Sequence, residues 1–167
     1  MSWNDLPART LEKSELVSLV DQLAALTELW RGELTFSAQR RQYMSLYRDQ
    51  YVDVWAIRWT RGSDTGWHDH DVSSGAVRVV RGSIREATPR IGGEHRVRAI
   101  RAGESFGFGP DHIHRLVGDE RSSVTVHAYS PPLWRLGQYS ISEDGVLRRV
   151  SVSYAEELRP LDPAEVG

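Results

Sequence analysis

Two histidines separated by one residue are the part of this sequence best suited to chemistry. His68 and His70 follow a glycine-rich turn that begins at Gly62. Residues i and i+2 of an extended strand point to the same face, so the two imidazoles would lie close together and form half of a metal site. His112 and His114 form a second pair with the same spacing. A barrel of strands that brings the pairs together would complete the site.

The second pair lies at a spacing that resembles a motif of the cupins, a family of small β-barrel proteins. In cupins a histidine follows a glycine by eleven residues, with a proline between them. Here Gly103 precedes His114 by eleven residues, and Pro110 lies between them. His114 is therefore predicted to be the third metal ligand. His112, on the same face, is the competing candidate, and otherwise a residue beside the ligands or at the rim of the pocket.

The first pair also resembles the cupin pattern, with one departure. Five residues separate Gly62 from His68, and Gly82 closes the motif. The glutamate that provides a fourth ligand in cupins is missing, because Ser74 or Gly75 stands at its place. Three neutral histidines leave up to three positions open on an octahedral metal, which suits Fe(II) that binds substrate and dioxygen together. Three histidines also hold catalytic zinc, so the ligand set alone leaves the metal open.

The elements that must position these residues are mostly strands. Alternating apolar and polar residues, separated by turns rich in glycine and proline, predict strands over residues 51–59, 76–80, 83–87, 95–100, 115–117, 124–129 and 146–152. Many short strands at such spacing indicate a sandwich or barrel. The predicted fold class is all-β, a cupin (small β-barrel or jelly roll) with N-terminal α-helices.

Helical spacing of apolar residues occurs before the strands. It predicts a helix over residues 10–31, with Thr10 as the N-cap and Gly32 after its end. A second, short helix is expected over residues 37–46. We expect one domain, made of a helical segment, a barrel and a tail over residues 1–50, 51–155 and 156–167.

Composition excludes several classes of protein. The chain has 167 residues, with 21 basic and 23 acidic side chains and a formal net charge of -2, so nucleic acid is not an expected partner. It contains no cysteine, which excludes disulfides and thiolate metal ligands. No apolar run approaches the roughly 20 residues of a membrane-spanning helix, and the polar N-terminus does not resemble a signal peptide. We expect a cytoplasmic monomer or homodimer without a membrane partner.

The residues around both histidine pairs resemble the cysteine dioxygenase family. The stretch from Trp67 to Glu86 is similar to the first motif of that family, and the His-Ala-Tyr-Ser-Pro-Pro segment over residues 127–132 is similar to its second half. The resemblance covers roughly residues 40–135. It implies a cupin with one Fe(2+) per chain, bound by His68, His70 and His114. It also implies an enzyme that adds both atoms of O2 to a small thiol and produces a sulfinic acid.

The resemblance implies further roles beside the iron. His127 and Tyr129 match the hydrogen-bonded histidine and tyrosine of the family, and Thr125 stands where the family usually has serine. These three residues share one face of an alternating strand, so a chain of hydroxyl, imidazole and phenol is expected. Tyr129 would donate a hydrogen bond to bound oxygen or substrate, and Ser130-Pro131 is a candidate cis peptide. A cysteine that cross-links to the tyrosine in some members is replaced here by Gly75.

The resemblance leaves the choice of thiol open. Cysteine-specific members hold the substrate carboxylate with an arginine, and the corresponding place in this chain falls at Gln42, next to Tyr43. Bacterial relatives that act on 3-mercaptopropionate resemble this chain in having glutamine there. They usually place another arginine downstream of the tyrosine, for which Arg135 is the candidate. The expected substrate is cysteine or a related thiol carboxylate, with a 3-mercaptopropionate-type dioxygenase as the alternative.

Two other classes of function use the same histidines. A zinc or manganese cupin would catalyse isomerisation or hydrolysis, but such an enzyme has no evident need for the pair His127 and Tyr129. A cupin that binds a small molecule without catalysis, for example as a sensor, is the third class. Sensors usually carry a DNA-binding or signalling domain, and none is expected within 167 residues. The thiol dioxygenase is therefore the favoured hypothesis.

Overall fold

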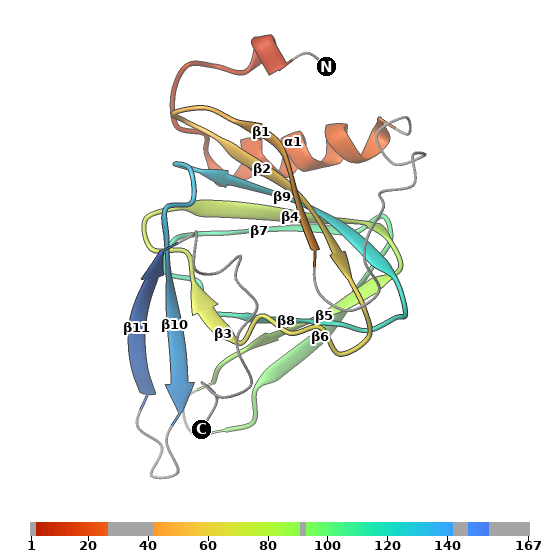
Figure 1. The fold of residues 1–167 in the computed structure, drawn as a ribbon, viewed down its shortest axis with the longest axis vertical. Helices are drawn as coiled ribbons and strands as arrows, with labels where there is room; N and C mark the ends of the chain where they lie inside the picture. Colours follow the sequence, from red (N-terminus) through yellow and green to blue (C-terminus); the bar gives the residue numbers. More distant parts are fainter. Residues whose placement is uncertain (1–2, 27–41, 91–92, 142–146, 154–167) are drawn as a thin grey trace.

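The computed structural model describes residues 3–26, 42–90, 93–141 and 147–153. Most of these residues belong to β-strands in two layers, and the one α-helix of the described residues lies outside them (Figure 1). The first layer is a five-stranded sheet, and the second consists of two three-stranded sheets. The predicted all-β class is confirmed. The seven predicted strands are all present, with ends that differ by at most two residues.

The five-stranded sheet is antiparallel throughout. From one edge to the other it contains β1 (Gln42–Arg48), β2 (Asp53–Trp59), β9 (Ser123–Ser130), β4 (Ser74–Arg81) and β7 (Ser105–Phe108). Strand β9 is the middle strand, and all eight of its residues are buried. Its two faces therefore meet different layers, and the side chains of β9 alternate between them.

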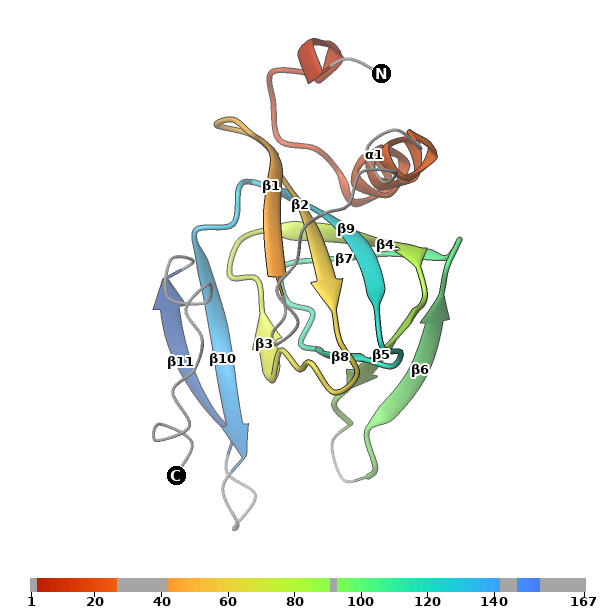
Figure 2. The same cartoon turned by 45° about the vertical axis from the view of Figure 1, so that its right-hand side comes forward.

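The second layer is built from two smaller sheets. One contains β11 (Leu147–Ser153), β10 (Arg135–Ile141) and β3 (Trp67–Asp69), and the other contains β6 (Arg96–Arg101), β5 (Ser83–Thr88) and β8 (Arg115–Gly118). Figure 2 shows the β10–β11 hairpin at one side of the barrel and β6 at the other. An isolated main-chain bridge between His68 and His114 links the two sheets. The seam between them therefore passes through two predicted metal ligands.

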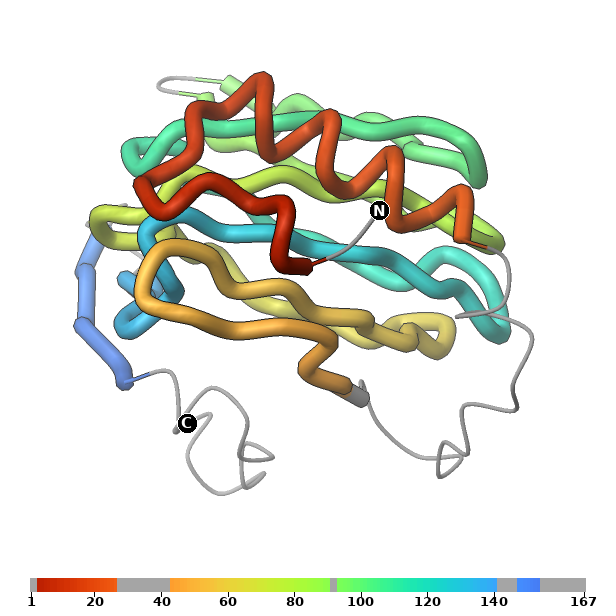
Figure 3. The backbone as a smooth tube through the Cα atoms, turned by 90° about the horizontal axis from the view of Figure 1, so that it is seen from above, coloured from red at the N-terminus to blue at the C-terminus, as the bar shows by residue number. Residues whose placement is uncertain are grey.

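One face of the five-stranded sheet is covered by α1 (Lys13–Ala25), which follows a short 3₁₀ turn, η1 (Trp3–Asp5). Figure 3 shows α1 lying across the sheet, over β4, β7 and β9. The helix buries Leu16, Leu19, Val20 and Leu23 against Val54, Ala76, Val126 and Ala128 of the sheet. This cluster leaves the opposite face of the sheet for the interior of the barrel.

The helix is shorter than predicted. It begins at Lys13 after the cap residue Glu12, because the Glu15 carboxylate accepts the main-chain N–H of Glu12 at 2.8 Å. Thr10 is not its N-cap. The helix ends at Ala25, and the remainder of the predicted span, residues 27–31, lies outside the described residues.

The expected helix over residues 37–46 is wrong for the part that the structure describes. Residues 42–46 belong to β1, whose backbone pairs with β2 in place of helical hydrogen bonds. Tyr43 packs edge-to-face on Trp55 at 6.5 Å between ring centroids, which a strand along β2 permits. Residues 37–41 lie outside the described part of the chain. No described helix is long and apolar enough to cross a bilayer.

A buried carboxylate fastens β3 to the C-terminal hairpin. Asp69 accepts hydrogen bonds from the Tyr139 hydroxyl at 2.5 Å, from Arg149 at 2.7 and 2.9 Å, and from the Gly137 N–H at 3.0 Å. A side chain on Gly137 would overlap both Asp69 and Arg149, so only glycine permits this approach. Because Asp69 stands between His68 and His70, these contacts fix the segment that carries both histidines.

We expect the substitution Asp69→Asn to lower stability and to change its pH dependence. Burial raises the pKa of the Asp69 carboxyl, but hydrogen bonds from Arg149 and Tyr139 outweigh burial and hold the pKa well below its usual range. A lowered pKa stabilises the fold above the unfolded pKa of about 4 and loses that contribution as the pH falls toward the folded pKa. At neutral pH the loss on substitution should be about 2–4 kcal/mol.

Urea unfolding of the metal-free protein between pH 7 and pH 3 measures this effect. The wild-type protein should lose stability steeply below about pH 4, while the asparagine variant should lose less over the same range. Parallel stability curves for the two proteins would show that Asp69 carries no such linkage.

Candidate metal centre

The three predicted ligands lie together at the seam of the second layer. The N–H of His68 donates to the carbonyl of His114 at 2.9 Å, and the N–H of His114 donates back to the carbonyl of His68 at 3.0 Å. Directly opposed residues of an antiparallel pair place their side chains on one face. His70 joins that face, with ring centroids 4.9 Å from His68 and 5.0 Å from His114. One ligand atom from each lies within 4.8 Å of the other two.

The nitrogen atoms of this group fit a metal ion. The Nδ1 atom of His68 lies 3.1 Å from the carbonyl of Gly66, which leaves Nε2 as the coordinating atom. The Nε2 atom of His114 is buried and has no hydrogen-bond partner among the described residues, and the same is true of Nδ1 of His70. Buried polar atoms are nearly always satisfied, so unpartnered nitrogens beside one another are a mark of a ligand site.

Electrostatics keep these histidines in the form that binds metals. Burial, together with the neighbouring histidines, holds the pKa of His70 well below its usual value. Burial also lowers the pKa of His114, although Glu86 acts in the opposite direction. A neutral imidazole has a lone pair to offer, whereas an imidazolium has none. His70 and His114 are therefore ready to bind a cation without first losing protons.

The predicted chain of hydroxyl, imidazole and phenol is present on the inner face of β9. The Thr125 Oγ1 lies 2.8 Å from Nε2 of His127, and Nδ1 of His127 lies 3.0 Å from the Tyr129 hydroxyl. Sequence reasoning missed a fourth member, since the indole Nε1 of Trp59 donates to Thr125 Oγ1 at 2.8 Å. Trp59 faces inward on the neighbouring strand β2, and its side chain is fully buried.

Trp59 sets which atom donates in each hydrogen bond of this series. An indole N–H can only donate, so the Thr125 oxygen accepts from it and directs its own proton to Nε2 of His127, its remaining partner in the described structure. His127 is then protonated on Nδ1 and donates to the Tyr129 oxygen. The O–H of Tyr129 is consequently directed to an acceptor other than His127.

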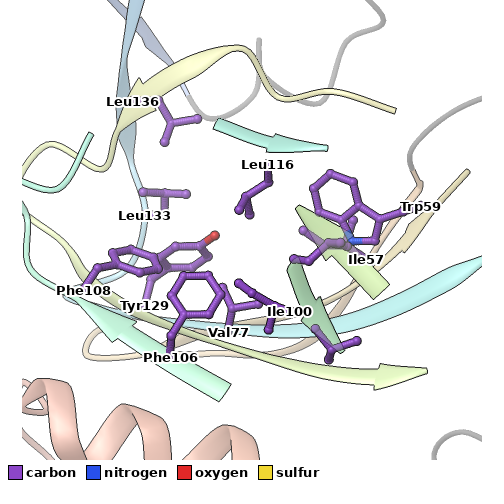
Figure 4. Packing of buried hydrophobic residues seen from close by; sticks show 12 residues of the cluster. Ile57, Trp59, Val77, Ile100, Phe106, Phe108, Leu116, Tyr129, Leu133 and Leu136 are labelled. Carbon is purple, nitrogen blue, oxygen red and sulfur yellow. The ribbon is translucent and has the colours of Figure 1, made fainter. Parts of the chain in front are cut away.

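An apolar cavity lies beside the three histidines. Its walls include His68, His70, Tyr129 and the inward residues Tyr43, Trp55, Ile57, Leu116, Leu133 and Leu136. Figure 4 shows Tyr129 beside Phe108, with its hydroxyl pointing into the interior of the barrel. Apolar walls of this kind exclude water and strengthen the few polar contacts inside. A small molecule in this cavity would meet the histidines and the Tyr129 hydroxyl together.

The predicted substrate-binding residues are not all brought to this cavity. Tyr43 lines it. Gln42 begins β1 opposite Arg58, but its side chain lies outside the described part of the structure. Arg135 is exposed at the start of β10 and is not part of the cavity wall. The roles of these three residues stay predictions.

A phenylalanine occupies the place beside Tyr129 where a side chain at position 75 would lie. Gly75 pairs with Tyr129 on one side and with Phe108 on the other. A Cβ on Gly75 would overlap the Phe108 ring and would lie 3.1 Å from Cδ1 of Tyr129. The same ring packs on His70, with centroids 4.5 Å apart. The packing of Phe108 therefore requires a glycine at position 75, where some members of the family have the cross-linking cysteine.

Sequence reasoning also missed Glu86, a glutamate on the buried face of β5. Its carboxylate is 1% exposed and lies 2.9 Å from Nδ1 of His114. The signal was present, because Glu86 is two residues from the apolar Ile84 and an alternating strand turns both to one face. A carboxylate on the inward face of a strand needs a buried partner.

The sequence matches the family model described as cysteine dioxygenase type I over residues 5–142. The chain belongs to the cysteine dioxygenase type I family. Membership makes it a cupin of the dioxygenase class of oxidoreductases, and the buried three-histidine group is compatible with iron. No curated protein matches the sequence.

Solved structures of other cupin-like proteins share the fold of this cysteine dioxygenase family member. A double-stranded β-helix protein from Klebsiella pneumoniae is 12% identical with a TM-score of 0.50, and the match covers 86% of this chain and 97% of that one. A protein from Bacillus halodurans is 17% identical with a TM-score of 0.51, covering 61% and 85%. An RmlC-like cupin from Desulfovibrio desulfuricans is 11% identical with a TM-score of 0.51, covering 61% and 94%. At such identities the likeness supports the fold alone.

The two neighbouring histidines His112 and His114 should respond differently to substitution. His114→Ala removes a predicted ligand and should abolish retention of iron through gel filtration. His112→Ala should leave iron bound and only weaken activity, because His112 lies 3.0 Å from Glu86 and is not in the three-histidine group. Metal analysis of both purified variants measures this. The reverse pattern would overturn the ligand assignment.

Gly75→Ala should destabilise the fold. The added methyl group overlaps the Phe108 ring, and overpacking of this kind costs about 1–3 kcal/mol. Gly93→Ala is the matched control, since a Cβ there meets no atom of the described structure within 4 Å. Thermal unfolding of the two variants compares them. Equal midpoints would mean that Phe108 moves aside without cost.

Proposed function

We propose that this protein is a non-haem iron thiol dioxygenase, which adds both oxygen atoms of O2 to a small thiol and yields the sulfinic acid. The observation that carries the proposal is that a group of three buried histidines lies beside one apolar cavity, whose walls include His68, His70 and Tyr129. Membership of the cysteine dioxygenase type I family supports the same chemistry. Fe(II) held by His68, His70 and His114 would supply open positions for a thiolate and for O2.

The ligand set favours this chemistry over hydrolysis. Burial lowers the pKa of His70 and of His114, which favours their neutral forms. The described residues bring no carboxylate into the three-histidine group itself. A small substrate and O2 then have room to bind side by side. A hydrolase with the same ligands would not need the hydrogen-bonded series that runs from Thr125 through His127 to the Tyr129 phenol.

The chain's own residues prepare the polar end of the site. Trp59 and Thr125 orient His127, and His127 holds the Tyr129 oxygen through its Nδ1–H. This contact draws electron density from the phenol oxygen and makes the Tyr129 O–H a better donor. Tyr129 would direct that proton to an oxygen or sulfur acceptor in the cavity. The apolar walls keep water away from the same acceptor.

We propose cysteine or a related thiol carboxylate as the substrate, with 3-mercaptopropionate as the alternative. None of the described residues that line the cavity is a lysine or an arginine. The place where cysteine-specific members of the family have an arginine falls at Gln42, so we propose that an uncharged polar group meets the carboxylate. Gln42, at the start of β1 beside Tyr43, is the proposed contact.

The experiment that tests the function uses iron-loaded protein and three thiols. Cysteine and 3-mercaptopropionate carry a carboxylate, while cysteamine does not. With one of the two carboxylates we expect O2 to be consumed in equal amount to thiol, and mass spectrometry should find the sulfinate. Cysteamine should react slowly.

The variant Tyr129→Phe is the control for the site. It should retain iron and lower kcat by roughly 100-fold, as loss of one oriented donor does in other active sites. Iron-loaded wild-type protein that consumes no O2 with any of the three thiols would overturn the proposal.

A further inference from the structure

A buried cluster of charge lies on the side of His114 away from the cavity. Glu86 reaches it from β5, and Arg98 from the neighbouring strand β6. Residues 86 and 98 are directly paired in the antiparallel register, so their side chains meet on one face. The Glu86 carboxylate is 1% exposed, whereas Arg98 is half-exposed. Burying a carboxylate destabilises the fold unless its oxygens are paired and hydrogen-bonded. The partners of Glu86 therefore indicate its role.

The two oxygens of Glu86 have separate partners. Oε2 accepts from the Arg98 guanidinium at 2.6 Å. Oε1 lies 2.9 Å from Nδ1 of His114 and 3.0 Å from Nε2 of His112. An ionised carboxylate can only accept, so both imidazole nitrogens that face it carry protons. For His114 this assigns the proton to Nδ1 and the lone pair to Nε2.

We propose that Glu86 is a positioning residue for the metal centre, which fixes the tautomer and direction of His114 and places a negative charge one imidazole away from the metal. The inference rests on the metal centre of the proposed function and names a residue that acts on it through a ligand. Nε2 of His114, like Nδ1 of His70, is buried and has no hydrogen-bond partner among the described residues. Glu86 therefore turns toward the metal a nitrogen that nothing in the described protein satisfies.

In this proposal, Glu86 takes over the role of the glutamate that is a direct fourth ligand in other cupins and is missing here near Gly75. A carboxylate on the metal would supply charge but would occupy one coordination position. Glu86 supplies charge through the imidazole, which becomes a stronger donor when its N–H is held by a carboxylate. The coordination position stays open for substrate or O2.

Arg98 and His112 hold Glu86 rather than the metal. Arg98 contacts the oxygen that faces away from His114, and it also lies over the Phe106 ring at 4.8 Å from the centroid. His112 stacks on Phe108 with centroids 5.5 Å apart and approaches the other oxygen from the rim. The carboxylate is thereby restrained on both sides.

A second cation at this cluster is the competing interpretation, because Glu86, His112 and His114 also lie close enough to bind one. The guanidinium of Arg98 opposes it, since a positive charge already contacts the same carboxylate. Metal titration decides between the two. One metal per chain agrees with the positioning role, and two per chain would overturn it.

The test compares Glu86→Gln with Asp53→Asn. Glutamine has one acceptor oxygen where the carboxylate uses two, so either Arg98 or the imidazoles lose their acceptor. Asp53 is the matched control, a fully buried carboxylate paired with an arginine, Arg48 at 3.2 Å, and with Trp55 at 2.7 Å instead of a histidine. The probe is Co(II). Calorimetry measures its affinity for each variant, and its visible spectrum reports on the coordination of the bound ion.

We expect Glu86→Gln to weaken Co(II) binding about 10–100-fold and to shift the spectrum, as loss of such a partner does at other metal sites. Asp53→Asn should change the affinity less than threefold even if it lowers thermal stability. Equal effects from both variants would reduce Glu86 to a structural carboxylate and overturn the proposal.

A measurement on unmutated, metal-free protein covers the case in which Glu86→Gln does not fold. Nitrogen-15 NMR of labelled histidine should show His114 protonated on Nδ1 and not on Nε2. The opposite tautomer would overturn the proposal. These readouts are separate from catalysis, since a protein that binds Co(II) through a Glu86-dependent site but oxidises no thiol would refute the proposed function alone.

Discussion

The site depends on a pair of main-chain hydrogen bonds between His68 and His114. These bonds join β3 to the residue that directly precedes β8, and so they link the two small sheets of the second layer. The same two bonds set the register of the ligands, because directly opposed residues must turn their side chains to one face. Asp69 anchors one side of this seam to the C-terminal hairpin, and Glu86 anchors the other. Two of the candidate metal ligands, His68 and His114, thus lie at the seam that closes the barrel.

Two sets of hydrogen bonds with assigned protons approach the same group of histidines. One begins at the indole of Trp59, which can only donate, and ends at the Tyr129 hydroxyl. In the other, Arg98 and His114 both donate to the carboxylate of Glu86, which can only accept. The interior of the barrel is otherwise apolar, and this makes both sets electrostatically strong.

Much of the fold could be predicted because strand patterns are local. The alternation over residues 124–129 predicted a strand and the shared face of Thr125, His127 and Tyr129. The short segment over residues 42–46 was misassigned to a helix, since its strand character comes from pairing with β2. Glu86 was overlooked for a related reason. A glutamate in an alternating strand looks like a solvent-facing residue until its partners, 12 and more residues away, are in place.

The sequence by itself determined the family, the all-β class and the candidate ligands. Glycine spacing and the two-residue period of a strand are local sequence patterns, so they can be recognised without knowledge of long-range contacts. Only the tertiary structure decided which nitrogen of each histidine is turned inward, what fills the space beside Gly75, and which buried carboxylate contacts His114. Those features depend on side chains from separate strands meeting in a water-poor interior, where each donor must find an acceptor.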